Sequence, residues 1–367
     1  MAIRLKKLRD QVIVITGASS GIGLTTARMA AHQGAALVLA ARSGEDLDQL
    51  VSEIQSRGGQ AVAVTADVAR EEDVRRIAAE ARRAFGGFDT WVNNAGASVY
   101  GRALDVSVDD MRRLFDTNVW GVVYGSRVAC DELRRHGGAL INVGSEVSDQ
   151  PIPLQVAYSA SKHAVKAWTD GLRMELDSEG APISVTLIKP GPIDTPYPHH
   201  AGNYLEDEPT HAPPVYKPES VARAILHAAT TPVREMFVGG SARFASTMHR
   251  VAPQLSNRLF GKAVMSSTHS GKPRRYEEAL HQPGGGLRER GDYEGMVRDS
   301  LYTRASMHPV LTGMAMVGVS LLVANWMRSG ERWEHRRTSA IYEPRTSWPP
   351  ATYGNETAPP PSDPLPS

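Results

Sequence analysis

The feature that most constrains the fold is a repeated alternation of short β-branched runs and longer helical stretches that end in glycine. The first run, Gln11–Thr16, is rich in Val and Ile, as strands are. A glycine-rich turn follows, and then a helical stretch, Leu24–Gln33, ends at Gly34. Strands that alternate with helices form parallel sheets covered on both faces, so the alternation predicts an α/β chain.

The alternation continues for most of the chain. Ser107 is expected to cap a long helix, with Asp109 and Asp110 in its first turn. The later strands are expected at residues 37–41, 61–65, 90–92, 139–143, 183–188 and 236–238. The helices are expected at residues 45–57, 71–85, about 107–136, around 158–162, and 219–229. We therefore predict a Rossmann-like, doubly wound parallel sheet of about seven strands, flanked by helices, with a helical C-terminal extension.

The composition narrows the class of protein. The 367 residues suffice for one large domain with an appendage, or for two domains, and the net charge of +1 gives no reason to expect a nucleic-acid partner. The single cysteine, Cys130, rules out an intrachain disulfide framework and suits a reducing compartment. The apolar run Val12–Ile15 is too short for the core of a signal peptide, so no secretory signal is expected.

Glycine-rich or polar residues follow nearly every expected strand. The carboxyl ends of parallel strands meet at one edge of a sheet, so these residues predict one ligand site there. The turn Gly17-x-x-x-Gly21-x-Gly23, between a strand and a helix, is suited to binding a pyrophosphate. Alone it would fit an ordinary loop equally well. The residues at this edge are Gly17–Gly23, Arg42, Asp67, Asn93–Gly96, Ser145 and Pro190–Thr195.

A tyrosine and a lysine stand four residues apart, which places Tyr158 and Lys162 on one face of a helix. A neighbouring ammonium group favours the phenolate and lowers the pKa of the phenol from about 10. Ser145 follows an expected strand, so its hydroxyl can meet Tyr158 in a crevice. A tyrosine and a lysine at this spacing also occur by chance in many helices. The functional interpretation is favoured here because the pair lies close to the other residues expected at the strand ends.

These motifs together resemble the short-chain dehydrogenase/reductase family over roughly residues 8 to 240. The resemblance implies hydride transfer between a nicotinamide and a carbonyl or secondary alcohol. It implies that Tyr158 is the general acid/base, that Ser145 hydrogen-bonds the reacting oxygen, and that Lys162 holds the nicotinamide ribose and lowers the pKa of Tyr158. Asn118 would hold a water molecule that links Lys162 to solvent. The motifs are Thr16–Gly23, Asn93–Gly96, Asn118, Ser145, Tyr158-x-x-x-Lys162 and Pro190-Gly191.

The resemblance also implies cofactor and substrate contacts. Family members that prefer NAD(H) carry an acidic residue after the second strand, but here Ala41 is followed by Arg42, which suits a 2′-phosphate. NADP(H) is therefore favoured over NAD(H), although a solvated surface arginine is the alternative interpretation of Arg42. The implied substrate contacts are Ser145, Val147 and Gln155. The implied cofactor contacts are Gly17, Ser19, Ser20, Gly21, Ile22, Gly23, Arg42, Asp67, Val68, Asn94, Ala95, Gly96, Tyr158, Lys162, Pro190, Gly191, Ile193 and Thr195.

The stretch 195–217 is rich in proline and histidine and takes the place of the loop that covers the substrate in this family. Three histidines, His199, His200 and His211, raise the alternative of a metal site. The family needs no metal and a proline-rich covering loop explains the composition, so no metal is expected.

The composition changes after residue 240, and four segments are expected. They are a catalytic domain (1–240), a helical and loop extension (241–303), a candidate membrane helix (304–330) and a disordered Pro/Ser/Thr-rich tail (331–367). Apolar residues from Met248 to Phe260 recur at helical spacing, which fits either a helix packed on the domain or one lying on a membrane surface. Residues 309–327 carry no charge and would be roughly 28 Å long as a helix, close to the thickness of a bilayer core. A buried or oligomer-forming helix is the alternative.

The leading hypothesis is an NADP(H)-dependent oxidoreductase acting on a lipophilic small molecule. Its catalytic domain would lie in the cytoplasm, attached to the membrane through 309–327, and it would form a homodimer or homotetramer, as family members do. A second hypothesis is a catalytically silent NADP(H)-binding sensor or membrane scaffold on the same fold. A third is dehydration or epimerisation by the same residues. The sequence leaves open the substrate, the reaction direction and the orientation of the apolar run.

Overall fold

The computed structural model describes residues 3–274, 278–310, 312–314, 317, 320, 322–323 and 326. The chain divides into two units, Met1–Pro309 and Val310–Ser367, and the elements described below belong to the first. Part of the predicted membrane helix 304–330, and the whole predicted tail 331–367, lie outside the described residues. Within the described part of the chain, no helix is both long enough and apolar enough to cross a bilayer.

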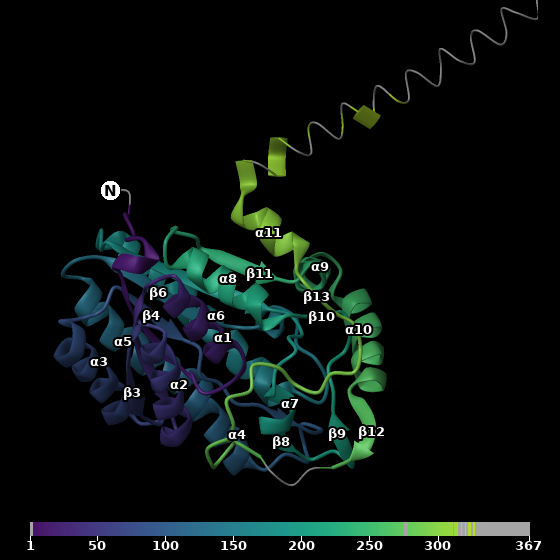
Figure 1. The fold of residues 1–367 in the computed structure, drawn as a ribbon. Coiled ribbons are helices and arrows are strands. Elements are labelled where there is room, and N and C mark those ends of the chain that lie inside the picture. Colours follow the sequence, from purple (N-terminus) through teal and green to yellow (C-terminus); the bar gives the residue numbers. More distant parts are fainter. Residues whose placement is uncertain are drawn as a thin grey trace, which may run out of the picture. The chain divides into compact units, whose positions relative to one another are not determined.

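A seven-stranded sheet forms the centre of the first unit, with the order β3-β2-β1-β4-β6-β7-β11 (Figure 1). Every pairing in it is parallel, as predicted, and the strand limits agree with those expected to within two residues. The predicted fold class is therefore confirmed. The strands are β1 (Val12–Thr16), β2 (Ala36–Ala41), β3 (Gln60–Thr65), β4 (Thr90–Asn93), β6 (Gly138–Val143), β7 (Ile183–Pro190) and β11 (Glu235–Val238).

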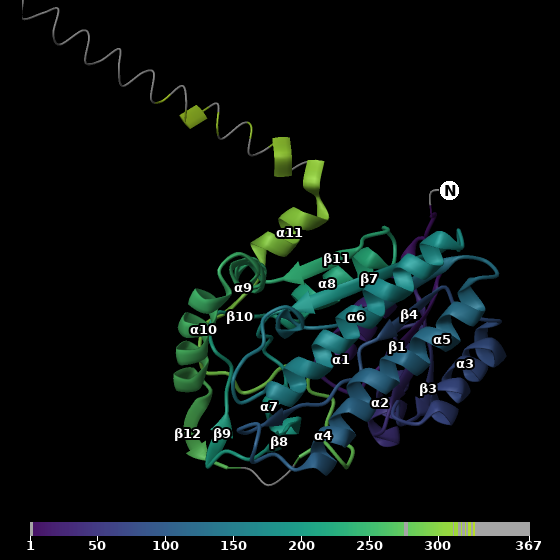
Figure 2. The same cartoon turned by 180° about the vertical axis from the view of Figure 1, so that it is seen from behind.

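Side chains alternate between the two faces of this sheet and pack into two separate hydrophobic cores. Ile13 and Ile15 of β1 pack with α1 (Gly21–His32), α2 (Gly44–Ser56) and α8 (Pro218–Ala228). Val14, between them, packs with α3 (Glu71–Phe85), α5 (Gly121–Leu133) and α6 (Val156–Ser178) on the other face. Figures 1 and 2, seen from opposite sides, show helices covering both faces. Burial on both faces explains why the strands are continuous apolar runs.

The long helical region expected after Ser107 is interrupted. Ser107 caps α4 (Val108–Phe115), and its hydroxyl accepts a hydrogen bond from the Asp110 N–H at 3.1 Å, as predicted. A single π-helical turn, Asp116–Trp120, then separates α4 from α5. This turn carries Asn118, and π-helical turns are often found at functional sites.

The elements that follow β11 within the first unit pack against its earlier part. Helices α9 (Gly240–Val251) and α10 (Pro253–Ser267) take the place of the one helical pattern expected near residues 248–260. The short strands β12 (His269–Pro273) and β13 (Val297–Arg298) pair with β9 (Asp207–Pro209) and β10 (Val215–Tyr216). Helix α11 (Leu301–Met307) follows. The remaining elements are η1 (Leu8–Asp10), β5 (Val99–Tyr100), η3 (Glu146–Ser148), α7 (Tyr197–His200) and β8 (Gly202–Asn203).

Candidate active site

The glycine turn after β1 is held against the loop after β4. Gly17 has a φ of +68°, and a Cβ added to it would lie 2.8 Å from the Ala95 Cα. The Asn94 side-chain amide donates to the carbonyls of Thr16 at 2.9 Å and Gly17 at 3.2 Å. A Cβ on Gly23 would lie only 2.0 Å from the Gly17 carbonyl oxygen, so the first turn of α1 packs directly on this turn. Only glycine allows these close approaches.

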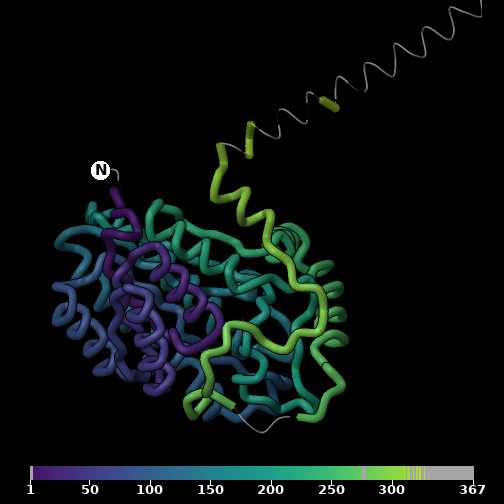
Figure 3. Tube along the Cα trace, viewed as in Figure 1, coloured from purple at the N-terminus to yellow at the C-terminus, as the bar shows by residue number. Residues whose placement is uncertain are grey.

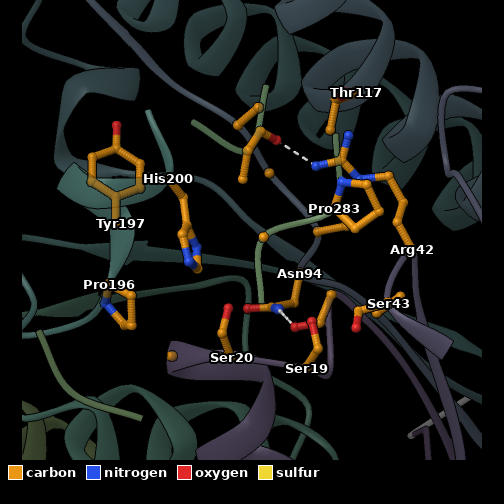
Figure 4. A pocket seen from close by; sticks show the side chains of 18 of the residues that line it. Ser19, Ser20, Arg42, Ser43, Asn94, Thr117, Pro196, Tyr197, His200 and Pro283 are labelled. Carbon is orange, nitrogen blue, oxygen red and sulfur yellow. Dashed lines mark hydrogen bonds between the residues drawn. The ribbon is translucent and has the colours of Figure 1, made fainter. Parts of the chain in front are cut away.

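A pocket opens at this edge of the sheet, where the turn, the ends of β2 and β3, and the loop after β4 meet. Figure 4 shows Ser19, Ser20 and Asn94 at one side of it and Arg42 at another. Serine hydroxyls, the start of a helix and a guanidinium are groups that bind phosphate, so these residues fit a dinucleotide. The predicted cofactor contacts that line it are Gly17, Ser19, Ser20, Gly21, Ile22, Arg42, Asp67, Val68, Asn94, Ala95, Gly96 and Thr195. We refer to it as the cofactor pocket.

The charged groups of the cofactor pocket already have protein partners. Arg42 is half-buried, and its guanidinium donates to the carbonyls of Ala279 and of Leu280, the latter at 3.1 Å. Burial and the nearby charge of Arg113 lower the pKa of Arg42. Asp67 forms a 2.7 Å ion pair with Arg113, a residue that was not predicted to belong to the site. Two guanidinium groups therefore lie near the end of β2.

The C-terminal extension contributes a wall to this pocket, which the sequence did not predict. Residues 278–291, in yellow-green in Figure 3, run back across the first unit. The Gly21 N–H donates to the Arg288 carbonyl at 2.8 Å, and Glu289 accepts a 2.7 Å hydrogen bond from Arg28 of α1. Ala279, Pro283 and Gly284 of this segment line the pocket.

Ser145, Tyr158 and Lys162 meet in a second pocket of about 260 Å³, which we call the substrate pocket. The Tyr158 hydroxyl bonds to Tyr197 and Ser145, and the Lys162 Nζ lies 5.7 Å from the centre of the Tyr158 ring. Ile22, Asn94, Gly96, Thr195 and Tyr197 line both pockets, so the two adjoin. The predicted contacts Pro190, Gly191 and Ile193 line the substrate pocket.

The pKa of Tyr158 differs in direction from the prediction. Burial raises the pKa of its phenol, and the charge of Glu146 adds to this, although hydrogen bonds from Tyr197 and Ser145 oppose it. Burial also lowers the pKa of Lys162 to about 8. The Lys162 ammonium donates to the Val143 carbonyl at 2.9 Å instead of to the phenol. In the protein alone, desolvation therefore outweighs the effect expected from the lysine.

Asn118 lines neither pocket. It is fully buried, and its side-chain amide makes two hydrogen bonds to the backbone of Ala97. The amide oxygen accepts from the Ala97 N–H at 2.8 Å, and the amide nitrogen donates to the Ala97 carbonyl at 3.0 Å. It also donates to the Ser161 hydroxyl at 3.0 Å on α6. These contacts link the loop after β4 to the helix that carries Tyr158 and Lys162. Gly23 likewise lines neither pocket.

The substrate pocket has walls from both the sheet edge and the extension. Val147 and Gln155 line it, and the Gln155 amide donates to Ser98 at 2.9 Å and to the Tyr197 hydroxyl at 3.0 Å. Five of the residues that sequence reasoning missed come from α9, α10 and the turn after α10. They are Ser241, Ala245, Phe260, Val264 and Thr268.

The three histidines of the covering loop lie apart. His200 lines the cofactor pocket, His211 lines the substrate pocket, and His199 lies 3.0 Å from Glu208. Burial lowers the pKa of His211 to about 4, so this imidazole is neutral. Over the described part of the chain, no group of three His, Cys, Asp or Glu side chains is arranged to hold a metal ion.

Parallel strands that bring a glycine turn and a Tyr–Lys helix to one edge are the architecture of short-chain oxidoreductases, and the chain belongs to that family. The family model described as short chain dehydrogenase matches residues 11–203. An uncharacterized oxidoreductase of Bacillus subtilis, YxnA, is 49% identical over 323 residues, which are 86% of this chain and 91% of the relative. That alignment is longer than the family match, so YxnA shares part of the chain beyond it.

Two solved structures extend the comparison. An alcohol dehydrogenase from Thermococcus sibiricus, complexed with 5-hydroxy-NADP, is 28% identical with a TM-score of 0.55. It matches 62% of this chain and 95% of its own. A short-chain dehydrogenase/reductase from Burkholderia phymatum, in complex with NAD, is 25% identical with a TM-score of 0.62, over 70% of this chain and 96% of its own. Neighbours of this fold thus bind nicotinamide dinucleotides of both kinds.

Proposed function

We propose that the protein is an NADP(H)-dependent oxidoreductase that interconverts a carbonyl and a secondary alcohol. The observation that carries the proposal is the meeting of Ser145, Tyr158 and Lys162 in a pocket that adjoins the glycine turn. A carbonyl compound in the substrate pocket would lie beside the nicotinamide end of a dinucleotide in the cofactor pocket. A bound nicotinamide would supply or accept the hydride.

The residues of the chain would do the remaining work. The Tyr158 hydroxyl would give its proton to the carbonyl oxygen during reduction and take it back during oxidation. Ser145, which bonds to Tyr158, would donate to the same oxygen and stabilise its developing charge. The raised pKa of Tyr158 keeps the proton on the phenol at neutral pH, which suits an acid in the reducing direction. Lys162 would hold the ribose, and Asn118 would keep the loop after β4 in place, with the proposed water beside it.

A substrate screen tests the function directly. Purified protein is mixed with NADPH or NADH and a panel of aliphatic, aromatic and polycyclic ketones, and the absorbance of the reduced cofactor is followed. Turnover of any ketone above the rate without protein supports the proposal. Cofactor binding without turnover of any ketone or alcohol would instead favour the catalytically silent sensor, and chemistry without net cofactor consumption would favour dehydration or epimerisation.

The preference for NADP(H) is a separate part of the proposal. Arg42 lines the cofactor pocket and Arg113 lies close by, so a 2′-phosphate would meet two positive charges. We expect Arg42→Asp to lower the ratio of kcat/KM for NADPH to that for NADH by roughly 100-fold, because charge-assisted bonds are lost and a repelling charge is introduced. Steady-state kinetics with both cofactors measure this ratio.

Arg70→Asp is the matched control, since Arg70 is exposed at the start of α3 and lines neither pocket. It makes the same change of charge and should leave the ratio within twofold of wild type. A wild-type preference for NADH, or an unchanged ratio in Arg42→Asp, would show that Arg42 does not read the 2′-phosphate.

We also propose that the chain assembles as a homodimer or homotetramer through α5 and α6. Trp120, just before α5, is 50% exposed and stacks on Tyr124, and Met174 on α6 is 71% exposed. Large apolar side chains of this kind mark interaction surfaces. Light scattering of the purified protein should give two or four times the mass of 39.8 kDa, and Trp120→Glu should shift it toward the monomer. A wild-type monomer at micromolar concentration would contradict the proposal.

A further inference from the structure

One half-buried acidic side chain that lines the substrate pocket has no role in the proposed reaction. Glu146 directly follows Ser145 and begins the short helix η3, and it lines the pocket. Its Oε2 lies 3.4 Å from the position that a Cβ on Gly191 would take, so the carboxyl group occupies space beside this glycine. Burial is the one cause that raises the pKa of Glu146, to about 7.

The carboxyl group of Glu146 has no hydrogen bond or ion pair to any residue that the structure describes. Neighbouring polar groups of the same pocket differ in this respect. Gln150 accepts from the Ser256 hydroxyl, Gln155 donates to Ser98, and Lys162 donates to the Val143 carbonyl. A ligand that fills the pocket would take water away from this carboxyl group, which is costly without a partner, so a ligand that brings a partner for it is favoured.

The rest of the pocket wall indicates the chemistry of the other part of that ligand. Apolar side chains from four parts of the chain surround the space beyond Ser145 and Tyr158, and they favour an apolar body. They are Val147, Ile152, Pro213, Pro214, Phe260 and Val264. The ammonium group of Lys162 donates to the Val143 carbonyl and forms no ion pair with Glu146, so a positive or hydrogen-bond-donating partner for Glu146 is left for the ligand to supply.

We propose that Glu146 determines substrate specificity by binding a second polar group of the substrate, an ammonium or a hydroxyl that donates to its carboxylate. The substrates are then carbonyl compounds or alcohols with an apolar body and one such donor at a distance from the reacting carbon. This inference rests on the proposed function. The ammonium group is expected to bind better than the hydroxyl, because charge-assisted hydrogen bonds are roughly twice as strong as neutral ones.

The test uses linear 2-alkanones of graded length that end in a methyl, a hydroxyl or an ammonium group. At the best length, wild-type protein should show a kcat/KM at least tenfold higher for the ammonium-ended or hydroxyl-ended ketone than for the methyl-ended one. Glu146→Gln, which keeps the size but loses the charge, should lower the ammonium-to-methyl ratio at least tenfold. The hydroxyl-to-methyl ratio should fall less, because the glutamine oxygen still accepts. A wild-type preference for the methyl-ended ketone, or equal ratios in both proteins, would overturn the inference.

The control variant is Glu175→Gln, the same substitution on the exposed face of α6, which should leave every ratio unchanged. A binding measurement separates this inference from the proposed function. Calorimetry with n-hexylammonium and with 1-hexanol, which contain no carbonyl, should give at least tenfold weaker ammonium binding to Glu146→Gln than to wild type. If this holds while no ketone is turned over, the proposed function fails and the binding role of Glu146 stands. If ketones are reduced with no difference between the end groups, the reverse is true.

Discussion

Replacing Tyr158 with phenylalanine is expected to lower kcat by roughly a thousandfold. The variant keeps the ring, which packs edge-on against Tyr197 with ring centres 5.6 Å apart, and removes only the hydroxyl that would transfer the proton. Positioned acids and bases contribute roughly 10²–10⁴-fold to rates, and no other group in the substrate pocket holds a proton at the position of the Tyr158 hydroxyl. Turnover of the best ketone from the screen, with NADPH saturating, measures the loss.

Two further measurements make the result specific to the proton. The affinity for NADPH, measured by fluorescence titration, should stay within threefold of wild type, since the other implied cofactor contacts, Lys162 among them, are unchanged. Tyr216→Phe removes the hydroxyl of another buried tyrosine, which lines neither pocket and lies 3.4 Å from the Ser241 hydroxyl. It should leave kcat within threefold. A Tyr158→Phe protein that turns over within tenfold of wild type would remove Tyr158 from the mechanism.

Replacing Lys189 with methionine is expected to destabilise the first unit by about 3–5 kcal/mol. Lys189 lies on β7 with a fully buried side chain, and its Nζ pairs with Asp149 at 2.7 Å and Glu235 at 2.9 Å. The same group lies 4.0 Å from the centre of the Phe237 ring. Burial acts to raise the pKa of Asp149, but the hydrogen bond and charge of Lys189 lower it below its usual value. Methionine fills the same space and leaves two carboxylates without their cation.

The loss should appear as a Tm lower by roughly 6–12 °C and as a lower urea midpoint. Lys272→Met provides the comparison, because Lys272 makes an exposed pair with Glu294 at 2.8 Å. Such pairs contribute about 0–1 kcal/mol, so this variant should unfold within about 2 °C of wild type. Equal effects of the two substitutions would show that burial of the Lys189 cluster does not matter. Asp149 also accepts from Ser246 of α9 at 2.9 Å, so the cluster joins the extension to the sheet.

The fold was predictable because the residues of each strand reflect whether the strand is buried on one face or on both. In β1, Ile13 and Ile15 face one core and Val14 faces the other. Because both faces of the strand are buried, its sequence is an unbroken apolar run. Caps such as Ser107 are local and could also be predicted. The π-helical turn at Asn118 was not predicted, because one extra residue in a helical turn leaves the apolar pattern almost unchanged.

The candidate site divides in the same way. The residues just past the strands could be placed together, because parallel strands end at one edge. The contribution of Phe260, Val264 and Pro283 to the pockets could not be predicted. It depends on how a segment that is distant in the sequence folds back onto the sheet edge. The direction in which the pKa of Tyr158 shifts was also predicted wrongly. The spacing of residues on a helix indicates which side chains are neighbours, but it does not indicate how far they are removed from water. Glu146 escaped notice because a glutamate after a strand is usually a surface residue.

The pocket walls contributed by residues 241–268 and 279–284 also bear on how the protein is made. A chain still on the ribosome that has emerged only as far as β11 contains every strand of the sheet and the whole Ser–Tyr–Lys set. It still lacks Phe260 and Val264, and the carbonyls of Ala279 and Arg288 that bond to Arg42 and Gly21. Domains generally fold as units, and the sheet and these later residues belong to one unit. Both pockets can therefore be complete only after the chain as far as Arg288 has left the ribosome.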